Sequence, residues 1–207
     1  GIGRTGKPFD MFRGRLMIPI IDVSGNIVAF GGRVLDDSKP KYLNTSDTPA
    51  FKKSKHLFAL NFAKTHCEER LILCEGYMDV IMLHAAGFEN AVATLGTAIT
   101  SEHARILRKY TQKVVIAYDS DEAGQNATEK ALRILAEAGV EAKVLRMNGA
   151  KDPDEYIKKF GADSFRRLIQ ASRTGFEFKL ESTLQKYNLS VAQDKIKASA
   201  EMCEYIS

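Results

Sequence analysis

Acidic residues follow two short apolar runs in this chain and could hold divalent metal. Glu75 comes directly after the apolar residues 71–74, and Asp119 and Asp121 come after residues 114–118. If both runs are strands of one parallel sheet, their carboxyl ends lie at the same edge and the acids meet in one crevice. Carboxylates gathered in this way bind the metal ions that assist phosphoryl transfer. The sequence therefore predicts a metal-dependent phosphoryl-transfer site.

The pair Asp119 and Asp121 also has a structural explanation. Either residue could cap the helix expected from Glu122 onward, because Asp is favoured at that position. One helix needs only one cap, however, and two neighbouring carboxylates repel each other and raise each other's pKa. A divalent cation removes this repulsion. Two aspartates separated by one residue therefore favour metal binding, with the cap as the alternative for either one alone.

The other acids of the expected site each have an ordinary structural role open to them. Glu75 by itself could stand in a turn, although its strand leads to the same sheet edge as that of Asp119. Asp79 lies in the first turn of the next helix, where a negative charge also favours the helix dipole. Asp152 and Asp154 form another acidic pair after a strand, and Asp152 could simply cap a helix. For each acid the sequence leaves both interpretations open.

Strand and helix patterns alternate between residues 70 and 151. Strands are expected at residues 71–74, 91–95, 114–118 and 141–147. Helices are expected at residues 77–86, from Thr100 or Ser101 to 110, and at 122–138. Strands separated by helices of this length imply right-handed crossovers. The fold class is therefore α/β, with a parallel sheet that carries helices on both faces.

The segments on either side of this region have different patterns. Residues 15–22 and 27–35 indicate a hairpin, in which Pro19 marks an edge strand or a bulge, and residues 39–46 are expected to form a loop. Beyond Asp152 the chain is expected to be helical throughout, at 153 onward, 163–171, 175–187 and 190–205. We therefore expect a basic β-rich amino-terminal subdomain at 1–67, a catalytic domain at 68–151 and a helical subdomain at 152–207. The start without Met and the end inside a helical pattern indicate a fragment.

Positive charge is concentrated in the first segment. The net charge is +4, and residues 1–60 hold ten Lys and Arg against five Asp and Glu, whereas the rest hold twenty against twenty-one. Acids at a site repel phosphates, so basic groups are needed in the same crevice. The lysines at 52–55 could instead be a solvated face. Arg33 follows two glycines that would let a phosphate approach the backbone, and Tyr42 could stack on a base or simply pack.

Composition argues against membrane and disulfide-based classes. The longest apolar runs are far too short to cross a bilayer, and no signal peptide opens the chain. The three cysteines, at positions 67, 74 and 203, are odd in number and lack paired metal-ligand spacing. We therefore expect no zinc site, no membrane partner and a reducing, cytoplasmic location.

Several motifs resemble a known family. Glu75-Gly76, followed after a crossover by Asp119-Ser-Asp121, resembles the Toprim domain of topoisomerases, bacterial primases and some nucleases. From about Phe9 to the helices after Gly175, the chain is similar to the RNA-polymerase core of the bacterial replicative DNA primases, the DnaG family. The motifs that carry this resemblance are Phe12-Arg-Gly-Arg-Leu-Met-Ile-Pro-Ile, Phe30-Gly-Gly-Arg-Val-Leu, Lys41-Tyr-Leu-Asn, Glu75-Gly-Tyr-Met-Asp-Val, Leu95-Gly-Thr, Tyr118-Asp-Ser-Asp-Glu-Ala-Gly and Asp152-Pro-Asp.

The resemblance implies a nucleotidyltransferase, a DNA-directed RNA polymerase that makes short RNA primers on single-stranded DNA for replication. It implies that the catalytic acids are Glu75, Asp119 and Asp121, with Asp79 and Asp152 close to two or more Mg²⁺ or Mn²⁺ ions. It also assigns the binding of nucleotide and template to Arg33, Lys41, Tyr42, Asn44 and Lys53. The implied partners are the DNA template, ribonucleoside triphosphates and the RNA primer. The replicative helicase at the bacterial replication fork would bind through a carboxyl-terminal module that is missing here, as is the zinc-binding module.

Two alternatives to primer synthesis remain open, and the first of them would use the same acids. A Toprim-type metal-dependent nuclease or topoisomerase fragment would break phosphodiesters instead of making them. A DNA-cleaving topoisomerase needs a nucleophilic tyrosine, and none of the seven tyrosines is identifiable as one. A nucleotide-binding module without catalysis is the third possibility, which the complete set of acids disfavours.

Overall fold

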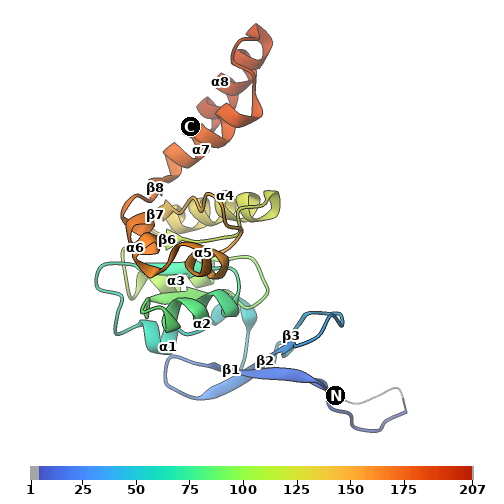
Figure 1. Ribbon diagram of the computed structural model, residues 1–207. Coiled ribbons are helices and arrows are strands. Elements are labelled where there is room, and N and C mark those ends of the chain that lie inside the picture. Colours follow the sequence, from blue (N-terminus) through green and yellow to red (C-terminus); the bar gives the residue numbers. More distant parts are fainter. Residues whose placement is uncertain (1–4, 207) are drawn as a thin grey trace.

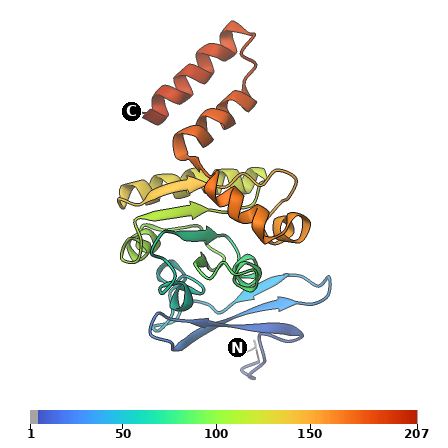
Figure 2. The ribbon, with the colours of Figure 1, turned by 60° about the vertical axis from the view of Figure 1, so that its left-hand side comes forward.

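The computed structural model describes residues 5–206, so residues 1–4 and Ser207 of the expected first and last segments lie outside the description. Two sheets build this part of the chain (Figure 1). A three-stranded antiparallel sheet, the small sheet, lies at one end, and a helical hairpin extends from the other end (Figure 2). Between them lies a five-stranded sheet, the large sheet, with helices on both faces.

The small sheet contains the expected hairpin. Strands β1 (Arg15–Ile21) and β2 (Ile27–Val34) pair antiparallel, and Pro19 lies in β1, which is an edge strand as predicted. The prediction of a loop over residues 39–46 is wrong in part, because Tyr42–Asn44 forms strand β3 against β2. Three residues are too few to show an alternating pattern. The strand forms because β2 offers a free edge for pairing.

The large sheet has the strand order β5-β4-β6-β7-β8. Its parallel strands lie where the sequence predicts them: β4 (Leu71–Cys74), β5 (Ala91–Ala93), β6 (Lys113–Ile116) and β7 (Glu141–Val144). Strand β8 (Arg173–Thr174) pairs antiparallel with β7, so the prediction of helices throughout the last segment is wrong at this point. Two residues carry no periodicity, and pairing with the edge of β7 determines their conformation.

The main helices also begin and end close to the predicted residues. They are α2 (Tyr77–Ala85), α3 (Ser101–Arg108), α4 (Glu122–Glu137), α5 (Pro153–Phe160), α6 (Ala162–Gln170), α7 (Gly175–Lys186) and α8 (Ala192–Ile206). A 3-10 helix, η1 (Lys53–Lys55), and a short helix, α1 (Leu60–Ala63), precede the large sheet and were not expected. Thr100 caps α3, and Pro153 occupies the first turn of α5, as the sequence predicts.

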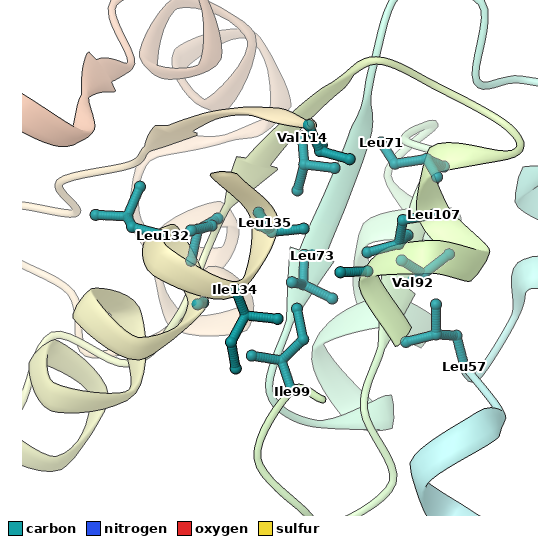
Figure 3. Packing of buried hydrophobic residues seen from close by; sticks show 14 of the residues in the cluster. Leu57, Leu71, Leu73, Val92, Ile99, Leu107, Val114, Leu132, Ile134 and Leu135 are labelled. Carbon is teal, nitrogen blue, oxygen red and sulfur yellow. The ribbon is translucent and has the colours of Figure 1, made fainter. Parts of the chain in front are cut away.

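Strand β4 lies at the centre of the core, and all four of its side chains are buried. Leu71 and Leu73 pack on the face covered by α1, α3 and α4 (Figure 3). Ile72 and Cys74 pack on the other face, under α2 and α6. A strand buried on both faces shows no polar alternation, which explains its continuous apolar sequence. The residue that follows such a strand is held in a fixed position.

The last helices fall into two groups. Helices α5 and α6 pack on the large sheet, where Phe165 is fully buried. Helices α7 and α8 form the projecting hairpin (Figure 2), and Lys179 of α7 pairs with Glu201 of α8 at 2.8 Å. Lys179 also joins the hairpin to α4 through Glu129 at 3.0 Å. None of the helices within residues 5–206 is long and apolar enough to cross a membrane.

Candidate active site at the carboxyl edge of the large sheet

A cleft of about 430 Å³ lies between the carboxyl edge of the large sheet and the small sheet. On the acidic side its lining includes Glu75, Asp79, Asp119, Asp152 and Asp154. On the basic side its lining includes Arg33, Lys41, Tyr42 and Asn44. The structure therefore brings together predicted residues that are far apart in the sequence, with the acids facing the cations.

Glu75 and Asp119 reach the cleft from neighbouring parallel strands. Glu75 directly follows β4, and Asp119 comes shortly after the end of β6, which pairs with β4. The backbone N–H of Asp119 donates to Glu75 Oε1 at 3.4 Å. The two carboxyl groups are thus placed at one edge by the burial of the strands that precede them.

Burial and mutual repulsion perturb these acids. Burial, and then the charge of Asp119, raises the pKa of Glu75. Burial also raises the pKa of Asp119, although the ammonium of Lys151 partly offsets this effect. For Asp79, burial and the nearby charges of Asp152 and Asp119 raise the pKa to about 7. Carboxyl groups that resist ionisation in this way would gain from a divalent cation between them.

Asp121 and Asp152 both act as helix caps. Asp121 Oδ1 accepts from the backbone N–H of Gly124 at 3.0 Å at the start of α4, and Asp152 Oδ1 accepts from that of Glu155 at 2.8 Å at the start of α5. The cap is therefore part of the explanation for both residues. It leaves Oδ2 of Asp121 available, and that oxygen lies 3.6 Å from Lys151 Nζ. Unlike Asp152, Asp121 is exposed and lies outside the lining of the cleft.

Two residues to which the sequence motifs gave no role hold this part of the site. A Cβ atom at Gly124 would lie 2.1 Å from the carbonyl oxygen of Asp119, so only glycine lets the Asp119 loop pack against α4. Lys151 lines the cleft and places its Nζ 3.6 Å from Asp119 Oδ2. Gly124 could have been recognised from the sequence as a site of close packing, because glycine is unfavourable inside a helix unless close packing requires it.

The basic side of the cleft is built around Tyr42. The guanidinium of Arg33 and the ammonium of Lys41 each lie 5.7 Å from the centre of its ring. The ring also meets that of Tyr77 edge to face, with centroids 5.5 Å apart, yet Tyr42 remains 41% exposed. Tyr42 therefore packs and still offers surface to a ligand. Asn44 ties the small sheet to the large-sheet edge, because its Nδ2 donates to the carbonyl of Leu95 at 3.1 Å.

The glycines before Arg33 serve packing. A Cβ atom at Gly31 would lie 3.1 Å from the ring of Tyr77, and one at Gly32 would lie 2.7 Å from the ring of Phe12. Side chains already fill the space on both sides of the strand. The expectation that these glycines leave room for a phosphate at the backbone is therefore wrong.

Lys53 is not brought to the cleft. It lies in η1, where its backbone N–H donates to Asp47 Oδ1 at 3.1 Å and its carbonyl accepts from Nε2 of His103 at 2.8 Å. Those contacts pack η1 against α3. Lys53 is absent from the residues that line the cleft.

The acidic side of the cleft has the donor chemistry of a magnesium or manganese site. Its donors are carboxylate oxygens, which these hard cations prefer. Asp154 Oδ1 is buried and has no hydrogen-bond partner among the described residues, as expected of a group that awaits a cation. Within residues 5–206, no three His, Cys, Asp or Glu side chains are already gathered closely enough to hold an ion. The residues therefore fit a divalent cation by the type of their donor atoms, although their side chains are not yet gathered around one point.

Two family models match the chain. The model described as the amino-terminal domain of the DNA primase catalytic core matches residues 2–64, and a Toprim-like model matches residues 72–157. The DNA primase of Clostridium acetobutylicum is 44% identical over 199 residues, which cover 96% of this chain and 33% of that protein. The chain spans about a third of the length of the curated relatives it matches.

Solved structures agree with these matches. A structure described as the DnaG primase catalytic domain bound to ssDNA is 33% identical, with a TM-score of 0.84, over 97% of this chain and 66% of that one. The RNA polymerase domain of Mycobacterium tuberculosis primase DnaG is 30% identical, with a TM-score of 0.78, over 99% of this chain and 72% of that domain. The chain belongs to the DnaG primase family. The resemblance found in the sequence motifs is therefore confirmed, as is the α/β fold of the Toprim type that a DnaG core implies.

Proposed function

We propose that this chain is the catalytic core of a DNA primase, which joins ribonucleotides into short RNA primers on a single-stranded DNA template. The observation that carries the proposal is the cleft in which the acids of the large-sheet edge face Arg33 and Lys41 of the small sheet. Family membership supports it, and so does the likeness to a DnaG catalytic domain bound to ssDNA. Because the chain spans about a third of its curated relatives, the activity is proposed for the core that these residues form.

The acids of the cleft, together with Asp121 beside it, would hold two or more Mg²⁺ or Mn²⁺ ions. We assign the ligands to Glu75, Asp79, Asp119, Asp121 and Asp152, of which Glu75, Asp119 and Asp121 are the catalytic acids. Bound divalent ions would lower the pKa of the attacking 3′ hydroxyl and neutralise charge on the departing pyrophosphate. Carboxyl groups with raised pKa values gain most from such ions, since the ions remove their mutual repulsion.

The basic side of the cleft would bind the substrates. Arg33 and Lys41 would contact the phosphates of the incoming ribonucleoside triphosphate or of the template, because they face the acids across the cleft. The exposed part of Tyr42 is available for stacking on a base. Asn44 keeps this side in place through its bond to Leu95. Lys53 lies away from the cleft, so its role would be limited to binding template DNA outside the site.

The proposal extends to the setting of the reaction. The RNA primer is the product, and the replicative helicase at the bacterial replication fork is the protein partner proposed for the full-length protein. A cytoplasmic location follows from that role. We propose the three segments 1–67, 68–151 and 152–207 as units of function. Helices α5 and α6 belong to the last segment and pack on the large sheet.

The test is a single assay with three outcomes. The protein is incubated with single-stranded DNA, ribonucleotides and Mg²⁺ or Mn²⁺, and the products are separated by length. RNA primers that depend on the metal, and that disappear in Asp119→Asn but not in the exposed control Glu137→Gln, would support the proposal. Cleaved DNA would point to a nuclease or topoisomerase activity, and binding without products would point to a non-catalytic module. Tyr77 at the cleft is a poor cleavage nucleophile, because burial raises its pKa to about 12.

A further inference from the structure

The ammonium group of Lys151 lies between two acids of the proposed site. Its Nζ is 3.6 Å from Asp119 Oδ2 and 3.6 Å from Asp121 Oδ2. No other lysine or arginine in the described part of the chain lies within 4.0 Å of either carboxylate. One positive charge thus faces two negative charges that neighbour each other in the sequence.

The backbone of Lys151 is fixed, whereas its side chain is free to move. Its carbonyl accepts from the backbone N–H of Ser120 at 2.8 Å, and its own N–H donates to Glu155 Oε2 at 2.6 Å. The first bond attaches the residue to the loop between Asp119 and Asp121, and the second attaches it to the first turn of α5. The side chain is 59% exposed, and its contacts to the two acids are longer than hydrogen bonds. It is therefore held by charge, and it can swing into solvent without disturbing the loop.

A divalent cation would need the oxygens that this ammonium faces. Oδ1 of Asp121 is engaged in capping α4, so Oδ2 is the oxygen available to a ligand, and Lys151 lies against it. Asp119 offers the same situation, since its Oδ2 also faces the ammonium. A lysine ammonium and a metal ion cannot occupy the space between two carboxylates together, because they repel each other and compete for the same lone pairs.

We propose that Lys151 is a built-in counter-cation of the metal site, which neutralises Asp119 and Asp121 before metal binds and is displaced when the ion enters. The proposal rests on the metal site of the proposed function. The positive charge of Lys151 then has one unfavourable effect, on metal binding, and one favourable effect, on the stability of the metal-free protein. Lys151 lowers the affinity of the site for divalent metal, and it stabilises the metal-free protein by relieving the repulsion between the two acids.

The experiment compares Lys151→Gln, Lys151→Arg and wild type for Mn²⁺ affinity by calorimetry, and for melting temperature in a chelator. Gln removes the charge and keeps most of the length of the side chain. We expect Lys151→Gln to bind Mn²⁺ on the order of tenfold more tightly, because the variant removes the repulsion between the ion and one unit charge a few ångströms away in a polar site. We expect it to melt at a lower temperature without metal. Lys151→Arg keeps the charge and should stay close to wild type in both measurements.

Two controls separate this proposal from the site on which it rests. Lys113→Gln removes the same charge at the opposite end of β6 and should leave Mn²⁺ affinity unchanged. Asp119→Asn combined with Asp121→Asn should abolish Mn²⁺ binding. If that double variant binds Mn²⁺ like wild type, the metal site is misplaced and both proposals fail. If it loses binding while Lys151→Gln binds Mn²⁺ equally or more weakly, the metal site stands and the counter-cation role of Lys151 is refuted.

Discussion

The two sides of the cleft are held in place by different means. Glu75 and Asp119 follow β4 and β6, whose residues fill the core of the large sheet. Arg33 lies in β2 and Lys41 directly precedes β3. The small sheet meets the large-sheet edge through a minor cluster that includes Phe51, Tyr77 and Leu95, and through the hydrogen bond from Asn44 to Leu95. We therefore expect the acidic side to be held more rigidly, as positioned chemistry requires, and the basic side to adjust more readily to a ligand. Changes on the acidic side should affect catalysis, and changes on the basic side should affect binding.

The largest effect is expected for Glu75→Gln. This change keeps the shape and the hydrogen bonding of the side chain but removes its charge, so primer synthesis should fall by at least about 100-fold. Template binding should remain nearly normal. The melting temperature should stay equal or rise slightly, because repulsion by Asp119 is relieved. Synthesis and melting are measured on the same preparation, with Glu137→Gln as control. Near-normal synthesis, or a large drop in melting temperature, would show that the role of Glu75 is structural and not catalytic.

A second strong effect is expected where the acidic side depends on close packing. In Gly124→Ala, the new Cβ would lie 2.1 Å from the Asp119 carbonyl oxygen, so the loop or the start of α4 must move. Unfolding in urea should show a loss of roughly 1–3 kcal/mol, the usual effect of overpacking. Synthesis should fall further than this loss explains, because Asp119 moves with its backbone. Asn126→Ala, an exposed change in the same turn of α4, serves as control. A fully active and stable Gly124→Ala would show that the loop is not constrained in this way.

Changes on the basic side should weaken binding and leave stability unchanged. Arg33→Ala and Lys41→Ala each remove one cation that faces the cleft. Each should lower affinity for single-stranded DNA or nucleotide, whatever the template sequence. The slope of log affinity against log salt should become shallower by about 0.7 for each phosphate that the variant no longer neutralises. Binding is measured at several salt concentrations, with Lys130→Ala on α4 as control. A wild-type slope in both variants would mean that these charges only face solvent.

The difference between the two sides also explains what the sequence could predict. The four-residue run before Glu75 marks a buried strand, and adjacent parallel strands share an edge, so the meeting of Glu75 with Asp119 could be predicted. The role of Lys151 could not, because its proximity to Asp119 depends on how two loops lie in space. The glycine pair before Arg33 was misjudged for a similar reason. Two adjacent glycines indicate that something approaches the backbone closely, but they do not show that it is the ring of Tyr77 rather than a ligand.

The smallest effect is expected far from the cleft, in the hairpin of α7 and α8. Hydrogen bonds and ion pairs from Lys179 and Lys186 lower the pKa of Glu201 to about 2. A carboxyl group whose pKa is depressed by folding stabilises the protein above its unfolded pKa, and this contribution disappears as the pH falls through the folded pKa. Glu201→Gln should therefore lower the melting temperature at pH 7 by roughly 2–4 °C, the shift that a loss of about 1 kcal/mol produces in a chain of this size.

The pH dependence distinguishes this network from a packing effect. The difference in melting temperature between wild type and Glu201→Gln should be full at pH 7 and should shrink between about pH 4.5 and pH 2, as Glu201 of the wild type becomes protonated. A loss of packing would persist at every pH. Primer synthesis at pH 7 should be unchanged well below the melting temperature, because neither Glu201 nor any other residue of α7 and α8 lines the cleft. A loss of synthesis in Glu201→Gln without loss of stability would mean that the hairpin and the acidic side of the cleft are coupled, and that the rigidity of that side does not come from the core of the large sheet alone.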